Sequence, residues 1–227
     1  MATVLITGAN RGIGLEFARQ YAADGWRVIA ACRNPKRAGD LEHVNGDASL
    51  VTLDVNDPES VDKLAAELGD APIDVLINNA GVYLDRGGTL DDIDFDDWAT
   101  TFAVNTLAPI RVARALAGKV ERSKRKLMVF LSSQMGSVGE NTSGGSYAYR
   151  SSKAALNAAV KSLAIDLKPR GITCAVLHPG WVRTDMGGKN ATLDVRDSVH
   201  GMRRVIEELK PERTGSFLRY NGEAVPW

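Results

Sequence analysis

Short apolar runs recur along the chain and alternate with longer segments of helical character. The runs lack the polar alternation of a strand that has one face in water, and they are typical of strands covered on both faces. We expect strands at 3–7, 27–31, 50–54, 74–78, 127–132 and 173–178, with 215–220 as a seventh. Such a chain is constrained to build a parallel sheet between two layers of helices.

Helix signals fill the intervals between these runs. Asp57 can cap a helix whose first position is Pro58, and the acidic segment 91–98 suits a helix N-terminus. We expect helices from about Gly12 to Gly25, from Pro58, from 91–98 past Ala117, from about Ser146 to Leu167, and from Val195 to Leu209. The order predicts an α/β fold in which residues 1–227 form a single domain, with a doubly wound parallel sheet in three layers.

The segment TGANRGIG at 7–14 follows the first expected strand and opens the first expected helix. Its glycines permit a tight turn and let the backbone approach a pyrophosphate at the helix N-terminus. A plain tight turn is the alternative, but the strand before and the helix after favour phosphate binding. The sequence therefore predicts a dinucleotide site that includes Gly8, Asn10, Arg11, Gly12, Ile13 and Gly14.

The end of the second expected strand carries a base where NAD-preferring sites usually carry an acid. Arg33 and Asn34 follow Ala31 and Cys32 there, and Arg11 adds a second cation within the glycine turn. A guanidinium suits the 2′-phosphate of NADP(H) through its charge and its forked donors. We expect NADP(H) as the cofactor; the alternative is that both arginines are merely solvated.

Further short motifs occur in order along the chain: LDV (53–55), NNAG (78–81), VN (104–105), SS (132–133), YRSSK (149–153) and PGWVRT (179–184). Together with TGANRGIG, they make the chain resemble the short-chain dehydrogenase/reductase family over nearly its whole length. The chain length, the spacing of Ser133 and Tyr149, and the ending GSFLRYNGEAVPW are most similar to the subgroup of C-factor and sniffer-type carbonyl reductases. The resemblance implies a Rossmann-like fold.

The resemblance also implies which further residues would bind the cofactor. Asp54 and Val55 would lie at the adenine ring. The edge of the fourth strand and the surroundings of the nicotinamide would supply Asn79, Ala80, Gly81, Pro179, Gly180, Val182 and Thr184. Each has a structural alternative when taken alone, since Asp54 could cap a turn and Pro179 could simply end a strand.

The YRSSK motif separates Tyr149 and Lys153 by one helical turn, so both side chains emerge on one face. A nearby ammonium stabilises tyrosinate, which predicts a phenol pKa below its ordinary value of about 10. By resemblance, Tyr149 is the general acid or base, Ser133 donates a hydrogen bond to the substrate oxygen, and Asn105 holds a water that connects Lys153 to solvent. Tyr149, Lys153 and Asn105 are also expected to contact the cofactor. Taken singly, these residues are more simply a surface pair and local hydrogen-bonding groups.

These features predict an NADPH-dependent oxidoreductase that reduces an aldehyde or a ketone to an alcohol, with Tyr149 as the acid. The expected partner is thus a small-molecule carbonyl substrate. Two alternatives stay open. One is a dinucleotide-binding signalling or sensor protein of the C-factor type, and the other is an NAD-dependent alcohol dehydrogenase.

The substrate side of the site is less clear from the sequence. Gln134, Met135, Tyr83, Trp181 and Met186 flank the motifs, and they could form an apolar pocket or pack elsewhere. By resemblance, segment 185–192 covers the substrate. It is short and contains glycine, which suggests a mobile lid and tolerance of varied carbonyls.

The balance of charge argues against partners bound through bulk charge, because 28 basic and 28 acidic residues give zero net charge. We therefore expect neither nucleic acid nor a membrane as a partner. Cys32 and Cys174 lie in apolar stretches without a metal-binding pattern. We expect no metal site and a reducing, cytoplasmic location.

Small residues continue beyond the tyrosine and the lysine in the helix that follows Ser146, namely Ala154, Ala155, Ala158 and Ala159. They would let a second helix approach closely, and the resemblance implies a homodimer formed through this helix. The high helix propensity of alanine explains the same residues equally well.

Overall fold

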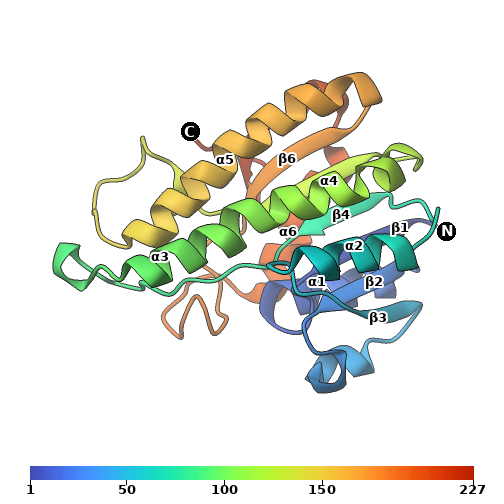
Figure 1. Cartoon of the computed structure of the whole chain (residues 1–227), viewed down its shortest axis with the longest axis horizontal. Helices are drawn as coiled ribbons and strands as arrows, with labels where there is room; N and C mark the ends of the chain where they lie inside the picture. The colour runs from blue at the N-terminus through green and yellow to red at the C-terminus, as the bar shows by residue number, and fades with distance from the viewer.

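Seven parallel strands form one sheet in the order β3-β2-β1-β4-β5-β6-β7 in the computed structural model, which describes residues 1–227 apart from the side chains of Arg37 and Glu42 (Figure 1). The strands are β1 (Thr3–Thr7), β2 (Arg27–Cys32), β3 (Ala48–Thr52), β4 (Val75–Asn78), β5 (Leu127–Leu131), β6 (Thr173–His178) and β7 (Ser216–Arg219). The predicted doubly wound sheet and its seven strands are confirmed. The largest shift is at β3, which begins and ends two residues before the predicted run.

The helices also follow the predicted order. They are α1 (Gly12–Ala23), α2 (Pro58–Glu67), α3 (Phe95–Phe102), α4 (Ala108–Glu121), α5 (Tyr147–Leu167) and α6 (Val195–Glu208). Asp57 caps α2 by accepting a hydrogen bond from the Glu59 amide at 3.0 Å. The helix predicted from the acidic segment past Ala117 is in fact α3 and α4, joined without a break by a π-helical turn over Ala103–Leu107.

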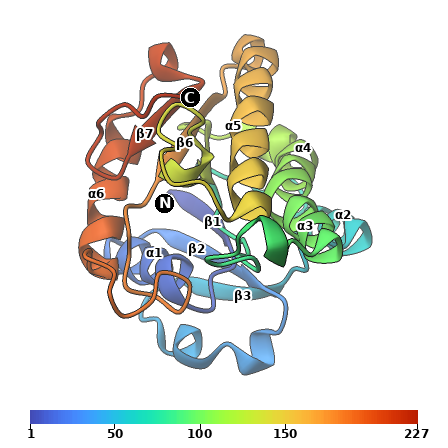
Figure 2. The same ribbon diagram turned by 90° about the vertical axis from the view of Figure 1, so that its left-hand side faces the viewer.

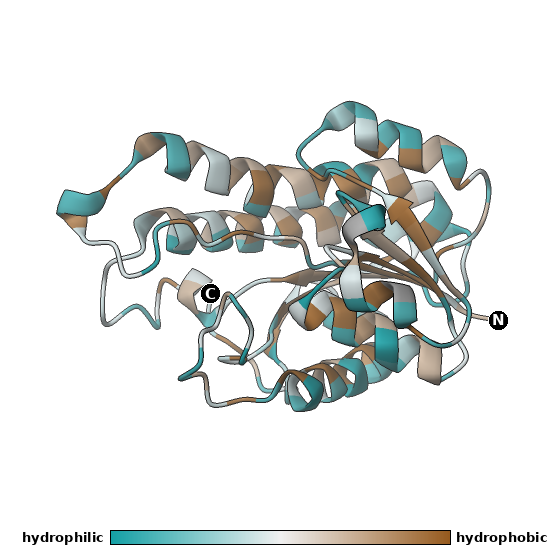
Figure 3. Cartoon of the chain, turned by 90° about the horizontal axis from the view of Figure 1, so that it is seen from below, coloured by the Kyte–Doolittle hydropathy of each residue, from teal (hydrophilic) through white to brown (hydrophobic). Residues whose placement is uncertain are grey.

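Helices cover both faces of the sheet, and this explains why its strands are apolar throughout. α1 and α6 lie on one face, whereas α2, α4 and α5 lie on the other (Figure 2). Within β1, Val4 and Ile6 pack in the first core and Leu5 packs in the second. Figure 3 shows the hydrophobic strands enclosed between helices whose outer faces are hydrophilic.

The strand order reverses beside β1, because β2 and β3 extend to one side of it and β4 to β7 extend to the other. β1 and β4 are paired in parallel, with Ile6 opposite Ile77, so their carboxyl ends lie side by side. In open α/β sheets, this switch point is where ligands bind. The glycine turn follows β1 here, and the segment that contains Asn79 follows β4.

Side-chain hydrogen bonds join the two strand ends. Asn79 Nδ2 donates to the carbonyl oxygens of Thr7 at 2.9 Å and Gly8 at 3.1 Å. Thr7 Oγ1 accepts from the backbone amides of Asn79 and Ala80 at 3.0 and 3.1 Å. Gly14 faces the same junction, where an added Cβ would lie 2.3 Å from the Gly8 carbonyl oxygen. The turn therefore has no room for a side chain at Gly14.

We predict that the same substitution has opposite effects at Gly14 and at Gly118. Alanine normally stabilises a helix over glycine by about 0.8–1 kcal/mol. An added Cβ at Gly118 in α4 would meet only the far end of the Arg122 side chain, at 3.5 Å. We expect Gly118→Ala to raise the free energy of unfolding, and Gly14→Ala to lower it by about 1–3 kcal/mol through overpacking. Urea denaturation measures both, and equal effects would contradict the close packing.

Candidate functional site

The carboxyl edge of the sheet brings together residues that are far apart in the sequence. Ser133 lies two residues beyond the end of β5, and Tyr149 and Lys153 occupy the first two turns of α5. Asn105 lies in the π-helical turn between α3 and α4, which packs against α5. The glycine turn and the segment 79–81 follow the neighbouring strands β1 and β4.

Tyr149 and Lys153 are both buried on the inner face of α5. Their relative exposures are 7% and 5%, and Lys153 Nζ lies 5.8 Å from the centroid of the Tyr149 ring. Lys153 Nζ also donates a hydrogen bond to the Leu131 carbonyl oxygen at 2.9 Å. The predicted common face is therefore present, with the ammonium anchored to the end of β5.

Burial decides the titration of this pair. The pKa of Tyr149 is raised to about 12, mainly because its phenolate would be desolvated, although a side-chain hydrogen bond with Ser133 acts in the opposite direction. The pKa of Lys153 is lowered to about 8 by burial of its ammonium. The prediction of a lowered phenol pKa was thus wrong for the protein alone, because desolvation outweighs the hydrogen bond with Ser133 and the charge of Arg86.

Ser133 is held by the start of a short 3₁₀ turn, Gln134–Gly136. Its Oγ accepts a hydrogen bond from the Met135 amide at 3.1 Å, which leaves the hydroxyl proton available to another acceptor. Gly136 lets this turn pack directly on α5, since an added Cβ would lie 2.8 Å from Lys153 Cβ. This contact keeps Ser133 close to Tyr149.

The Asn105 side chain makes three hydrogen bonds within the protein. Its Oδ1 accepts from the Val82 amide at 2.9 Å, and its Nδ2 donates to the Val82 carbonyl at 2.9 Å and to Ser152 Oγ at 3.1 Å. A Cβ at Gly81 would crowd this group, because it would lie 3.1 Å from Asn105 Oδ1, whereas its distance of 3.6 Å from Lys153 Nζ is an ordinary contact. Asn105 thus joins the end of β4 to α5, and a water-holding role stays a prediction.

The glycine turn leaves the N-terminus of α1 without a side-chain cap. Gly8 and Gly12 both have positive φ values, of 65° and 54°, which favour glycine. The uncapped helix N-terminus can thus receive a phosphate, and in this respect the structure fits the predicted cofactor. Ile13 packs against the core, while Asn10 is half-buried beside the turn.

Arg11 is already paired. Its Nη1 contacts Asp185 Oδ2 at 2.9 Å, but both side chains are well exposed, at 66% and 79%. Exposed pairs of this kind contribute about 0–1 kcal/mol, so Arg11 can exchange Asp185 for a phosphate at small cost. Arg33 and Asn34 are exposed directly after β2, and none of the ion pairs among the described side chains includes Arg33.

Asp54 lies beyond the end of β3 and accepts a hydrogen bond from the Asn56 amide at 3.0 Å, as in an Asx turn. Val55 is half-buried against the second core. Asp54 therefore caps a turn, which was the structural alternative, and this contact uses one of its carboxylate oxygens. Contact with an adenine ring stays a prediction for both residues.

The segment after β6 forms a compact loop over the glycine turn. Gly180 has a φ of 87°, and an added Cβ there would lie 2.7 Å from a Leu193 methyl group. Val182 and Leu193 form an isolated β-bridge, which closes the loop that was expected to be a lid. Thr184 lies against Gly12, with its Cγ2 3.3 Å from the position of an added Cβ. Pro179 accepts from Ser198 Oγ at 2.6 Å.

The loop of residues 83–88 also lies at this site, although the motifs did not identify its polar residues. The Tyr83 ring stacks on Tyr149 with centroids 4.1 Å apart, and Arg86 lies 5.5 Å from the Tyr83 centroid. Asp85 accepts hydrogen bonds from the first turn of α5. The LDR sequence at 84–86 gives no local sign of these contacts, because the partners lie about 60 and 100 residues away.

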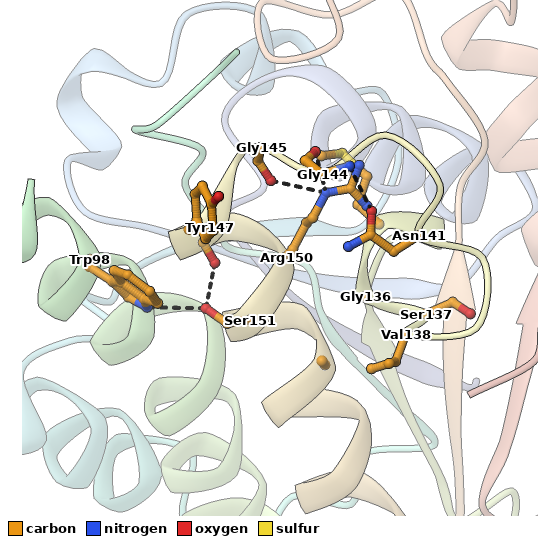
Figure 4. Close-up of a pocket in the computed structure, with 12 residues that line it drawn as sticks. Trp98, Gly136, Ser137, Val138, Asn141, Gly144, Gly145, Tyr147, Arg150 and Ser151 are labelled. Atoms are coloured by element: carbon orange, nitrogen blue, oxygen red, sulfur yellow. Dashed lines mark hydrogen bonds between the residues drawn. The ribbon is translucent and has the colours of Figure 1, made fainter. Parts of the chain in front are cut away.

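An open pocket of about 250 Å³ lies beside the first turns of α5 (Figure 4). Trp98, Tyr147, Arg150 and Val138 are among its walls. Of the predicted pocket residues, only Met135 lines it. Ser133, Tyr149 and Lys153 do not, so this pocket adjoins the candidate site without containing it.

The loop between Ser133 and α5 is braced by the last strand. Arg219 of β7 donates to Gln134 Oε1 at 2.9 Å and contacts both carboxylate oxygens of Glu140, at 2.9 and 3.1 Å. This ion pair is largely shielded from water, with both side chains about one quarter exposed. Arg219 thus holds in place the loop that follows Ser133.

Comparison with known proteins agrees with this geometry. The sequence profile described as "short chain dehydrogenase" matches residues 2–194. The chain belongs to the short-chain dehydrogenase family. It is 50% identical over 163 residues to C-signal of Myxococcus xanthus, a match that covers 72% of this chain and 98% of that protein.

Solved structures of family members share the whole fold. The carbonyl reductase Sniffer of D. melanogaster superposes with a TM-score of 0.93 at 35% identity and covers 100% of both chains. The NADPH-bound carbonyl reductase from chicken fatty liver has a TM-score of 0.92 at 34% identity, over 100% of this chain and 99% of that one. These neighbours support the predicted resemblance to carbonyl reductases within the family. Among the described residues, no helix is both long and apolar enough to cross a membrane.

We predict that the buried ammonium of this family member makes stability depend on pH. The Lys153 pKa is about 8 in the folded chain, below the ordinary lysine value of 10.5. Between these values the unfolded chain binds more protons, so the contribution of Lys153 to the free energy of unfolding increases with pH. This increase is absent in Lys153→Met.

Urea denaturation of wild type and Lys153→Met from pH 7 to pH 10 measures this contribution. The stability of wild type relative to the variant should increase by at most about 1.4 kcal/mol per pH unit above pH 8. Lys161→Met, at an exposed position of the same helix, is the control and should give a much flatter difference. A flat difference for both variants would refute the assignment.

Proposed function

We propose that the protein is an NADP(H)-dependent oxidoreductase that reduces an aldehyde or a ketone to an alcohol. One observation carries this proposal: a buried Tyr149 is flanked by Ser133 and Lys153 at the carboxyl edge of the sheet, the same edge that carries a helix N-terminus able to receive phosphate. Carbonyl reduction needs a hydride for the carbon and a proton for the oxygen. When bound, NADPH supplies the hydride.

The three side chains have complementary tasks in this proposal. Tyr149, with a pKa near 12, stays protonated at neutral pH and can give its Oη proton to the carbonyl oxygen. Lys153, with a pKa near 8, is mostly charged at neutral pH and stabilises the phenolate left behind. The Ser133 hydroxyl donates a hydrogen bond to the same substrate oxygen as negative charge develops.

Arg33 and Arg11 support NADP(H) over NAD(H). Arg11 follows β1 and Arg33 follows the neighbouring strand β2, and Arg33 has no ion-pair partner among the described side chains. A guanidinium is suited to a ribose 2′-phosphate, whereas a ribose 2′-hydroxyl is usually bound by an acid. The remaining predicted cofactor residues surround the same edge of the sheet, and we retain them as ligands in the proposal.

A signalling or sensor function is the second candidate, and the 50% identity with C-signal favours it. The two functions are compatible with one dinucleotide site. They differ in turnover, since a protein that only senses the cofactor needs no proton donor in reach of a substrate. The presence of Tyr149, Lys153 and Ser133 together therefore supports an enzyme.

We extend the proposal to the assembly and the location of the protein. Residues 1–227 would act as one domain, because the sheet includes strands from both ends of the chain. A homodimer through α5 is supported by the exposure of Leu107 at 57% and Ile165 at 63% on the outer side of the helices. Both cysteines are free and buried, which supports a reducing, cytoplasmic location.

Tyr149→Phe tests the chemistry, and Tyr147→Phe in the same helix is its matched control. We expect Tyr149→Phe to lower kcat by about 10²–10⁴-fold through loss of the proton donor, with NADPH affinity unchanged. Tyr147 is 37% exposed, and its replacement should leave kcat intact. NADPH consumption against a panel of aldehydes and ketones gives the rates. Near-normal turnover of Tyr149→Phe would refute the mechanism, and no turnover of the wild type would favour the sensor.

Arg33→Ala tests the cofactor preference. Loss of a charged hydrogen bond to the 2′-phosphate should raise the Kd for NADPH by about 10–100-fold and leave the Kd for NADH unchanged. Arg27→Ala is the control, because Arg27 is exposed at the opposite end of the same strand. Fluorescence titration with each cofactor measures these values. An equal loss for NADH and NADPH would contradict a role at the 2′-phosphate.

A further inference from the structure

The helix that carries Tyr149 begins without a cap of its own. Ser146, at the N-cap position, is in the left-handed region with a φ of 50°, and its side chain makes no capping hydrogen bond. Its Oγ is instead 2.7 Å from the Tyr83 hydroxyl. The free amides at the start of α5 therefore need an acceptor from elsewhere in the chain.

Asp85 supplies that acceptor from a distant segment. Its Oδ2 accepts from the Ala148 amide at 2.7 Å, and its Oδ1 accepts from the Tyr149 amide at 3.2 Å. The Gly88 carbonyl accepts from the Ser146 amide at 2.9 Å. We propose that Asp85 is a positioning residue for Tyr149, whose carboxylate fixes the first turn of α5 and holds the phenol at the reacting position. The proposal rests on the proposed function and deepens it.

The other aspartate caps of this fold are local, and the contrast separates positioning from ordinary capping. Asp94 accepts from the amides of Asp96 and Asp97 at 2.8 and 3.0 Å, within its own helix start. Asp85 is 63 residues from Ala148. Its cap therefore links α5 to a loop that has its own contacts with the site.

That loop joins the tyrosine helix to the segment over the glycine turn. Tyr83 stacks on Tyr149 with an interplanar angle of 21°. Arg86, above the Tyr83 ring, donates from Nη2 to the Asp185 carbonyl at 3.3 Å. Loss of the Asp85 cap would release the helix start and this stack together, because residues 83–88 form one short loop.

The carboxylate also acts on the proton held by Tyr149. Ser133, Tyr83, Asp85 and Arg86 act on the phenol from other elements, and Lys153 lies on its own helix. Asp85 raises the pKa of Tyr149, whereas Ser133 and Arg86 lower it. Without the Asp85 charge, the positive end of the helix would favour the phenolate more strongly. Removal of this charge should therefore lower the Tyr149 pKa.

Asp85→Asn tests the proposal, with Asp94→Asn as the matched control at a local cap. Alcohol oxidation by NADP⁺ passes a hydride to the cofactor and the hydroxyl proton to the Tyr149 phenolate, so its rate rises with pH as the phenol ionises. We expect Asp85→Asn to shift this rise to lower pH by about 0.2–0.7 unit. We also expect kcat to fall on the order of tenfold through misplacement, with the Kd for NADP⁺ unchanged. Asp94→Asn should leave the profile in place.

Hydrogen exchange of the amides of residues 147–150 gives a second readout that needs no turnover. Exchange of these amides should be faster in Asp85→Asn than in wild type and faster still in Asp85→Ala, while the exchange rates of the α6 amides stay unchanged. A wild-type protein without reductase activity would refute the proposed function, and the exchange rates would still decide whether Asp85 holds the helix. An active wild type whose Asp85→Asn variant matches Asp94→Asn in pH profile, kcat and exchange would overturn the positioning role alone.

Discussion

Burial of the Lys153 ammonium is the constraint around which the candidate site is arranged. A charged group with 5% exposure is costly unless its donors are satisfied, and here the Leu131 carbonyl at the end of β5 accepts one hydrogen bond. Gly136 makes the enclosure possible, since a Cβ there would lie 2.8 Å from Lys153 Cβ. Burial of this ammonium thus costs stability, whereas the proposed chemistry requires a charged group at this position.

The same enclosure explains the titration of the tyrosine. Helical spacing alone suggests that a lysine one turn away lowers the phenol pKa. In the folded chain both groups lose water together, and desolvation moves each toward its neutral form. The pKa values of a buried acid–base pair therefore depend more on how far both groups are removed from water than on the charge of the nearest neighbour.

Sequence periodicity and turn chemistry were sufficient for the order of the elements, because most strands are apolar runs and α2, α3 and α6 begin at an aspartate cap. The Asp57 cap and the strand limits of β1 and β6 are direct examples. Motif spacing also identified Ser133, Tyr149 and Lys153, which the fold places together at the carboxyl edge of the sheet. Spacing did not reveal the π-helical turn at Asn105 or the cap from Asp85, since both depend on partners that only the folded chain brings near. The Asp54 carboxylate has a local partner and the Asn79 amide is engaged by the end of β1, so their expected cofactor contacts could not be read from the motif alone.

The contacts of Arg219 with the loop after Ser133 come from a part of the chain that the family profile does not match. The family profile ends at residue 194, whereas Arg219 lies in β7 beyond that limit. The residues proposed to transfer the proton lie inside the matched portion, whereas the loop next to them is held by a strand outside that portion. Relatives that diverge only in their final strand can change which molecules fit beside Ser133 while every recognisable motif stays intact. Motif content then identifies the reaction class but carries little information about substrate choice.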